Sequence, residues 1–173
     1  MSYVSKTWQE RCFGIFPALL VVALALLLLK WQFAPHGQAF LRIYDLNTGQ
    51  VYVEQPAKPG DKVYFGWLHS LENIPWDEYY HIDEKLNLVL DAITFPAFGA
   101  GIPESKGRVC YIKDGLIHME EIAETFRELV WLNSHTATRD IRLDGRLAAR
   151  GRDLPQHVRL RLVIERDGAH GAR

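Results

Sequence analysis

The feature that most constrains this chain is an uncharged apolar run near its N-terminus, residues 12–29, which reads CFGIFPALLVVALALLLL. An apolar run of about 18 residues is long enough to cross the hydrocarbon core of a bilayer as a helix. The flanking polar and aromatic residues are Lys6, Glu10, Arg11, Lys30, Trp31 and Phe33. The run therefore predicts a single N-terminal transmembrane helix within an anchor at residues 1–33.

Two alternatives to an uncleaved anchor are a cleaved signal peptide and a buried core helix. A signal peptide has an apolar region of about 7–15 residues followed by a small-residue cleavage site. The best such site here, Gly37-Gln38-Ala39, lies well past the run, so cleavage is poorly signalled. A core helix is disfavoured because the run is apolar on every side and lies at the chain terminus.

The basic residues Lys6 and Arg11 favour a cytoplasmic N-terminus, although Lys30 opposes them. We therefore expect the rest of the chain to face outward. In a bacterium, this makes a single-pass protein of the inner (cytoplasmic) membrane, with residues 12–33 in the lipid bilayer and a periplasmic C-terminal domain.

Beyond the anchor, the composition is that of an ordinary globular domain. Hydrophobic residues make up 48% of the 173 residues, yet mean hydropathy is only -0.11 because the apolar run holds much of that content. The net charge of -1 gives no reason to expect a nucleic-acid partner, and two cysteines exclude a disulfide scaffold. We expect a linker at residues 34–39, a β-domain at residues 40–166 and a disordered tail at residues 167–173.

Short alternating segments separated by turn residues predict that this domain is mainly β. Hairpin turns are expected at Asn47-Thr48-Gly49, Asp114-Gly115 and Asp144-Gly145. The expected strands are residues 40–46, 51–54, 63–70, 79–83, 86–95, 109–113, 116–119, 141–143, 146–148 and 158–165.

Two local features complete this expectation. Breaks are expected at Pro56, Pro59 and Gly60, and a turn at Pro75. The spacing of Ile122, Phe126, Leu129 and Val130 predicts a short helix over residues 120–128, giving way to a strand at residues 129–132. The predicted fold is an antiparallel β-sandwich or open barrel with one short helix.

The densest polar cluster lies at residues 69–81, HSLENIPWDEYYH. Its histidines and carboxylates are metal-ligand types, and the candidate ligands are His69, Glu72, Glu78 and, further along, His135. The spacing is not a known zinc signature, and on a strand Glu78 and His81 would face opposite sides. We therefore predict neither a metal nor another cofactor.

Three further interpretations of this cluster stay open. Ser70 beside His69 could be a nucleophile, but the chain has no G-x-S-x-G elbow, so we expect no enzyme activity. A histidine and a glutamate could instead close a buried hydrogen-bond network. The third interpretation is a recognition surface, formed with the exposed-looking aromatic residues Trp67, Trp76, Tyr79 and Tyr80.

Two other segments have unusual composition. The loop at residues 95–103, FPAFGAGIP, is expected to be a rigid turn, with an anion-binding nest as the alternative. From Arg139 onward the chain is rich in arginine. That pattern predicts a solvated strand face, the alternative being a basic surface for acidic lipid head groups or an acidic partner.

The cluster and the loop together carry a family resemblance. His69-Ser70-x-Glu72-x-x-Pro75-x-x-Glu78, followed by a strand ending in Phe95 and then Phe98-Gly99-Ala100-Gly101-x-Pro103, resembles the bacterial domain-of-unknown-function 1850 family. The resemblance extends over about residues 40–164, although the helical stretch and the arginine-rich tail lie outside the family pattern.

The resemblance implies a small membrane-anchored or secreted protein of a family often encoded beside TRAP transporters of the TAXI type. The expected function is a non-enzymatic accessory module that contacts the TRAP membrane subunits or the periplasmic binding protein. The expected binding residues are His69, Ser70, Glu72, Glu78, Phe98, Gly99, Gly101 and Pro103. The alternative is a periplasmic metal-binding or hydrolytic domain that uses His69, Glu72 and Glu78.

Overall fold

The computed structural model describes Leu24 and residues 37–69, 71–99 and 105–167. The chain divides into two compact units, Met1–His36 and Gly37–Arg173. The predicted transmembrane segment lies outside the described residues apart from Leu24, as does the predicted tail beyond Asp167. Among the described residues, no helix is long and apolar enough to cross a membrane.

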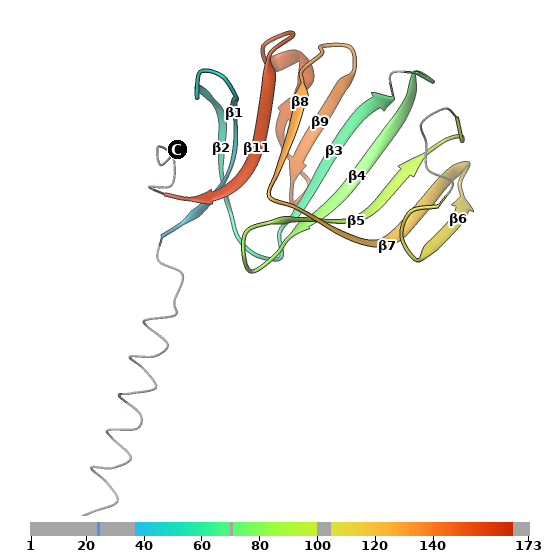
Figure 1. The fold of residues 1–173 in the computed structure, drawn as a ribbon, viewed down its shortest axis with the longest axis horizontal. Coiled ribbons are helices and arrows are strands. Elements are labelled where there is room, and N and C mark those ends of the chain that lie inside the picture. Colours follow the sequence, from blue (N-terminus) through green and yellow to red (C-terminus); the bar gives the residue numbers. More distant parts are fainter. Residues whose placement is uncertain (1–23, 25–36, 70, 100–104, 168–173) are drawn as a thin grey trace, which may run out of the picture. The chain divides into compact units, whose positions relative to one another are not determined.

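The described residues of the unit Gly37–Arg173 form two antiparallel sheets (Figure 1). The smaller sheet has the order β2-β1-β11-β8 and the larger has the order β10-β9-β3-β4-β5-β7-β6. The strands of the smaller sheet are β1 (Ala39–Asp45), β2 (Val51–Ala57), β8 (Glu128–Leu132) and β11 (Arg159–Arg166). The strands of the larger sheet are β3 (Lys62–His69), β4 (Ile74–Ile82), β5 (Leu88–Phe95), β6 (Val109–Lys113), β7 (Leu116–Phe126), β9 (Thr138–Leu143) and β10 (Arg146–Arg150). The predicted mainly β, antiparallel fold is confirmed as an open, sandwich-like arrangement.

The tight turns form where the turn residues predicted them. Asp114 and Gly115 join β6 to β7 with φ angles of 52° and 77°, and Asp144 and Gly145 join β9 to β10 with 47° and 74°. Two successive positive φ angles match the right-handed twist of the flanking strands, which is why Asp-Gly suits a two-residue hairpin.

The helix predicted over residues 120–128 is wrong. This stretch continues β7 and leads into β8, and the described part of residues 37–167 holds only one helical turn, the 3-10 element Gly151–Asp153. Glu120 pairs with Ala92 and Glu124 with Leu90, so β7 takes four steps where β5 takes two. This bulge interrupts the alternation of inward and outward side chains along β7. As a result, Ile122 and Phe126 both pack on the core although they are four residues apart, which is a spacing typical of a helix.

Two prolines predicted to interrupt the chain lie inside strands instead. Pro56 lies in the edge strand β2, opposite Phe40. Pro75 lies near the start of β4, opposite Leu68, before the pairing of β4 with β5 begins at Asp77. Neither position needs a second ladder hydrogen bond, so a residue without an N–H group is tolerated there.

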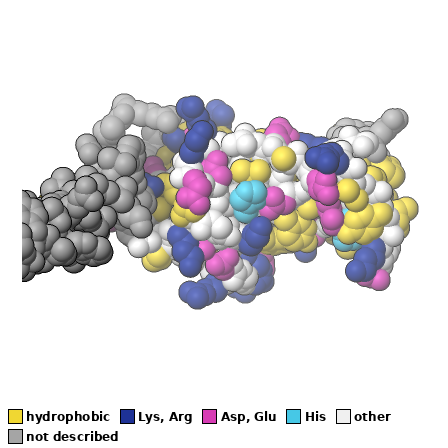
Figure 2. All heavy atoms as spheres, turned by 90° about the horizontal axis from the view of Figure 1, so that it is seen from below, with side chains coloured by type: hydrophobic (Ala, Val, Ile, Leu, Met, Phe, Trp, Pro, Cys, Tyr) yellow, Lys and Arg dark blue, Asp and Glu magenta, His cyan; other side chains and the backbone are white. Residues whose placement is uncertain are grey.

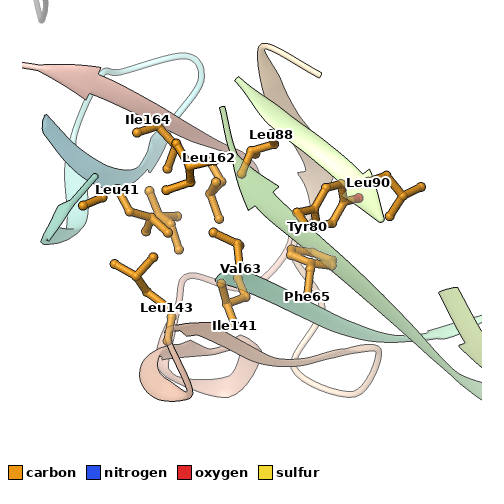
Figure 3. Packing of buried hydrophobic residues seen from close by; sticks show 14 of the residues in the cluster. Leu41, Val63, Phe65, Tyr80, Leu88, Leu90, Ile141, Leu143, Leu162 and Ile164 are labelled. Atoms are coloured by element: carbon orange, nitrogen blue, oxygen red, sulfur yellow. The ribbon is translucent and has the colours of Figure 1, made fainter. Parts of the chain in front are cut away.

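The core lies between the facing sides of the two sheets (Figure 3). Leu41 and Leu162 from the smaller sheet are completely buried, and Ile141 and Leu88 from the larger sheet are buried equally. Figure 3 shows these side chains converging from both sheets, with Phe65, Tyr80 and Leu90 together at one side of the cluster. Burial of these apolar faces is the main favourable contribution to folding.

More than half of the nine arginines from Arg139 onward lie beside an acidic side chain. Five of these arginines form ion pairs: Arg139 with Asp77, Arg142 and Arg150 with Asp140, Arg152 with Asp153, and Arg161 with Glu128. Figure 2 shows basic and acidic side chains interspersed over one face of the molecule. This pairing supports the solvated strand face over a concentrated basic surface.

We predict that Leu162→Ala lowers the free energy of unfolding by about 2–5 kcal/mol, because it leaves a cavity in a closely packed core. Urea denaturation followed by tryptophan fluorescence measures this change. The matched control is Leu132→Ala, since Leu132 is 61% exposed on the edge strand β8, and its effect should stay within about 0.5 kcal/mol. Equal effects of the two substitutions would contradict this placement of the core.

Candidate functional site

The two segments that carried the family resemblance meet at one end of the domain. Glu72, in the β3–β4 turn, packs over Gly99 in the segment after β5, where an added Cβ would lie 2.5 Å from the Glu72 Cδ atom. Beside them, Leu71 is 71% and Phe98 53% exposed. We call these two segments, residues 71–73 and 98–99, the motif end. It combines an acidic side chain with two exposed apolar ones.

A row of aromatic rings connects the motif end to the interior. The rings of His69 and Trp67 lie 5.7 Å apart, and Trp67 and Trp76 lie 5.6 Å apart. Trp76 stacks on Phe95 at 4.8 Å, and Phe98 meets Phe95 edge-on at 5.7 Å. His69 therefore acts as one more ring in this row, and its buried Nδ1 atom has no hydrogen-bond partner among the described residues.

Glu78 is the polar centre on the inner side of the larger sheet. One carboxylate oxygen accepts hydrogen bonds from the indole N–H groups of Trp67, at 3.3 Å, and Trp76, at 3.1 Å. The other oxygen accepts a hydrogen bond from the hydroxyl of Tyr80 at 2.6 Å. The alternation of β4 produces this arrangement, because Trp76, Glu78 and Tyr80 are spaced two residues apart and share one face.

Burial and the contact with Glu78 determine the protonation state of Tyr80. Burial raises the pKa of its phenol well above the ordinary value, and the adjacent Glu78 carboxylate raises it further. Tyr80 therefore remains a protonated donor to Glu78 over the physiological range. The hydrogen bonds to Glu78 satisfy three buried or half-buried donors that would otherwise be costly in an apolar interior.

A cavity of about 490 Å³ opens beside Glu78, between β8 and the larger sheet. Its walls are mostly apolar and aromatic, with Glu78, Lys106 and Glu128 as the charged lining residues. The aromatic lining residues are Phe65, Trp67, Tyr80, Phe126 and Trp131. Cavities of this size and character are typical of sites for small organic ligands.

The structure separates the residues proposed as metal ligands. Glu78 faces inward and His81 outward on β4, as predicted for a strand. Glu72 lies over Gly99, and the Nε2 atom of His135 is hydrogen-bonded to the Leu154 carbonyl at 2.8 Å. Across the described residues, no three His, Cys, Asp or Glu side chains are grouped so that they could hold a metal ion.

The remaining predicted binding residues, Ser70, Gly101 and Pro103, lie outside the described residues. The prediction of exposed aromatic residues was wrong for Trp76 and Tyr80, which are buried. The sequence did not indicate Phe65, Phe126 and Trp131 as site residues, although all three line the cavity. The burial of Trp76 and Tyr80 could have been predicted from the sequence. If the strand is taken to begin at Ile74, the alternation of side chains places both on the same face as the apolar residue Ile82.

Part of the chain matches a known protein family. The family model described as a domain of unknown function (DUF1850) matches residues 63–148. This range contains the motif end, Glu78 and most of the larger sheet. No curated protein and no solved structure matches the chain.

We predict that Glu78→Ala lowers the free energy of unfolding by about 1–3 kcal/mol, because buried donors lose their acceptor. Glu78→Gln should cost less, since its amide oxygen still accepts. The exposed turn residue Glu84 provides the control Glu84→Ala. Chemical denaturation of the three variants tests the role of Glu78, and a Glu78→Ala protein as stable as the control would refute it.

The raised pKa of Tyr80 predicts a loss of stability in alkali. Tyrosine in the unfolded chain ionises near pH ~10, whereas folded Tyr80 stays protonated, so the unfolded state binds fewer protons above that pH. Stability is therefore full below about pH 10 and falls as the pH rises. In denaturation curves from pH 8 to 11, Tyr80→Phe should flatten this decline, while Tyr52→Phe on β2 serves as the comparison. An unchanged decline in Tyr80→Phe would rule out this contribution.

Proposed function

This chain belongs to the DUF1850 family, and on that premise we propose that it is a membrane-anchored accessory protein of a TAXI-type TRAP solute transport system. In this proposal, residues 12–33 anchor it in the bacterial inner membrane and the β-domain lies in the periplasm. The domain acts as a non-enzymatic binding module for the transporter's membrane subunits or its periplasmic binding protein.

The observation that carries this proposal is the convergence of the two motif segments at the motif end. Their contact holds Leu71 and Phe98 outward beside Glu72, on loops supported by the aromatic row. Loops positioned by a rigid sheet are common places for recognition residues. Exposed apolar side chains next to a charged one resemble the centre and rim of a protein–protein interface.

The chemistry of the cluster supports binding over acid–base catalysis. A catalytic carboxylate must reach a proton of the substrate. Both oxygens of Glu78 already accept hydrogen bonds from the protein's own side chains. Its contacts are those of a group that fixes β3 and β4 beneath the motif end.

A membrane anchor would make a weak contact sufficient. Two proteins held in the same membrane meet at a high effective concentration, so modest affinity between the motif end and a transporter subunit produces substantial occupancy. The small size of the motif end is consistent with such a transient interface.

We predict that Leu71→Ser combined with Phe98→Ser reduces co-purification of the full-length chain with TRAP membrane subunits or the binding protein. Both proteins would be produced together and captured through the accessory protein from solubilised membranes. Loss of two apolar contacts, each worth more than about 1 kcal/mol, should lower the captured amount at least about fivefold.

The control is Ile112→Ser, because Ile112 is 74% exposed on β6, outside the motif end. This variant should retain capture at the level of the unaltered chain. Equal capture by the control and the double variant would remove the motif end from the interface. Failure of the unaltered chain to capture any TRAP component would contradict the transporter association itself.

A further inference from the structure

The cavity beside Glu78 has a charge imbalance that the proposed function does not use. Three charged residues line it, and two of them already have partners of opposite charge. Lys106 pairs with Glu124 at 2.6 Å, and Glu128 pairs with Arg161. Glu78 has only neutral partners among the described residues, namely two indoles and a phenol. The cavity therefore presents one carboxylate whose charge no described cation offsets.

The walls around this carboxylate are suited to a cation. Phe65 and Trp131 meet edge-on at 5.1 Å, and Tyr80 and Phe126 meet edge-on at 6.1 Å, so two aromatic pairs line the space with Trp67. The face of an aromatic ring carries negative electrostatic potential and attracts cations. A carboxylate among apolar walls acts through a lower dielectric than one in water, which strengthens its attraction for positive charge.

The hydrogen bonds that Glu78 already accepts indicate which class of cation suits the cavity. A carboxylate has about four acceptor positions, and three are occupied by Trp67, Trp76 and Tyr80. Glu78 therefore has about one acceptor position left for the three N–H donors of a primary ammonium group, and buried donors without a partner are costly. A quaternary ammonium group has no N–H donor, so it gains the Coulombic and cation–π attraction without that cost.

We propose that the cavity between β8 and the larger sheet binds a small quaternary ammonium compound, with Glu78 as its counter-ion and the surrounding rings as its cage. The volume of about 490 Å³ lies within the range for small-molecule sites. The cavity is lined by residues other than those of the motif end, so this proposal does not depend on the transporter association.

Isothermal titration of the full-length chain in uncharged maltoside micelles tests the proposal. The probes are choline, its neutral isostere tert-butylethanol, in which carbon replaces nitrogen, and the anion of tert-butylacetic acid. Ethanolamine supplies the primary ammonium. Choline should bind at least about tenfold more tightly than tert-butylethanol, because a desolvated cation–π contact alone supplies about that factor. Choline should also bind more tightly than ethanolamine, and the anion should bind most weakly.

Two variants locate the site. Glu78→Gln should weaken choline binding at least about tenfold while leaving tert-butylethanol almost unaffected, since only charge is removed. Trp131→Leu keeps an apolar wall but removes one ring, and should weaken choline by about threefold or more. Glu84→Gln, on the exposed β4–β5 turn, is the matched charge control and should bind choline normally.

Each other outcome overturns the proposal. Equal affinity for choline and tert-butylethanol would show an apolar cavity without charge selection, and preference for the anion would reverse the assigned charge. Tighter binding of ethanolamine would refute the quaternary class. Absence of choline binding, or unchanged binding by a folded Glu78→Gln variant, would remove the site from this cavity.

Discussion

The two sheets of this domain differ in width, and this mismatch determines where the domain is open. Adjacent strands lie about 4.8 Å apart, so a seven-stranded sheet is roughly 14 Å wider than a four-stranded one. The smaller sheet covers only part of the larger and ends at β8. At that edge the cavity opens beside β8, and further along the larger sheet β6 is exposed along its whole length. A carboxylate could be placed beneath the uncovered part because three donors from β3 and β4 surround it.

The sequence was most informative where short-range geometry decides the structure. Asp114-Gly115 and Asp144-Gly145 indicated two hairpins, because few residues adopt positive φ easily and a two-residue turn needs it twice. Alternation along residues 158–165 indicated a half-buried strand, which is β11. The meeting of Glu72 with Gly99 could be expected only from the resemblance, since no local pattern brings a turn to a loop 27 positions further along the chain.

The spacing of apolar residues gave a wrong prediction where pairing with another strand alters the local backbone. Ile122 and Phe126 have the spacing of a helix because the strand bulges at Glu121 and Ala123, which both have positive φ and lie on either side of Ile122. That bulge exists only in the pairing of β7 with β5. The cavity could not be anticipated either, because Phe65 and Trp131 belong to different sheets and come together only when the sheets pack. The chemical types of the candidate residues could therefore be identified from the sequence, but the way that they come together to form the cavity could not be predicted.

The pairing of β1 with β11 determines the order in which this domain can be completed during synthesis. Ala39 lies opposite Arg166, so the first strand of the domain is held by the last. All seven strands of the larger sheet leave the ribosome between these two, and they can pair with one another before β11 exists. Until β11 arrives, β1 and β2 form an isolated hairpin, which is marginally stable in water. The apolar side of the larger sheet therefore stays uncovered until the end of translation, when the chain is most open to misfolding and to the binding of chaperones.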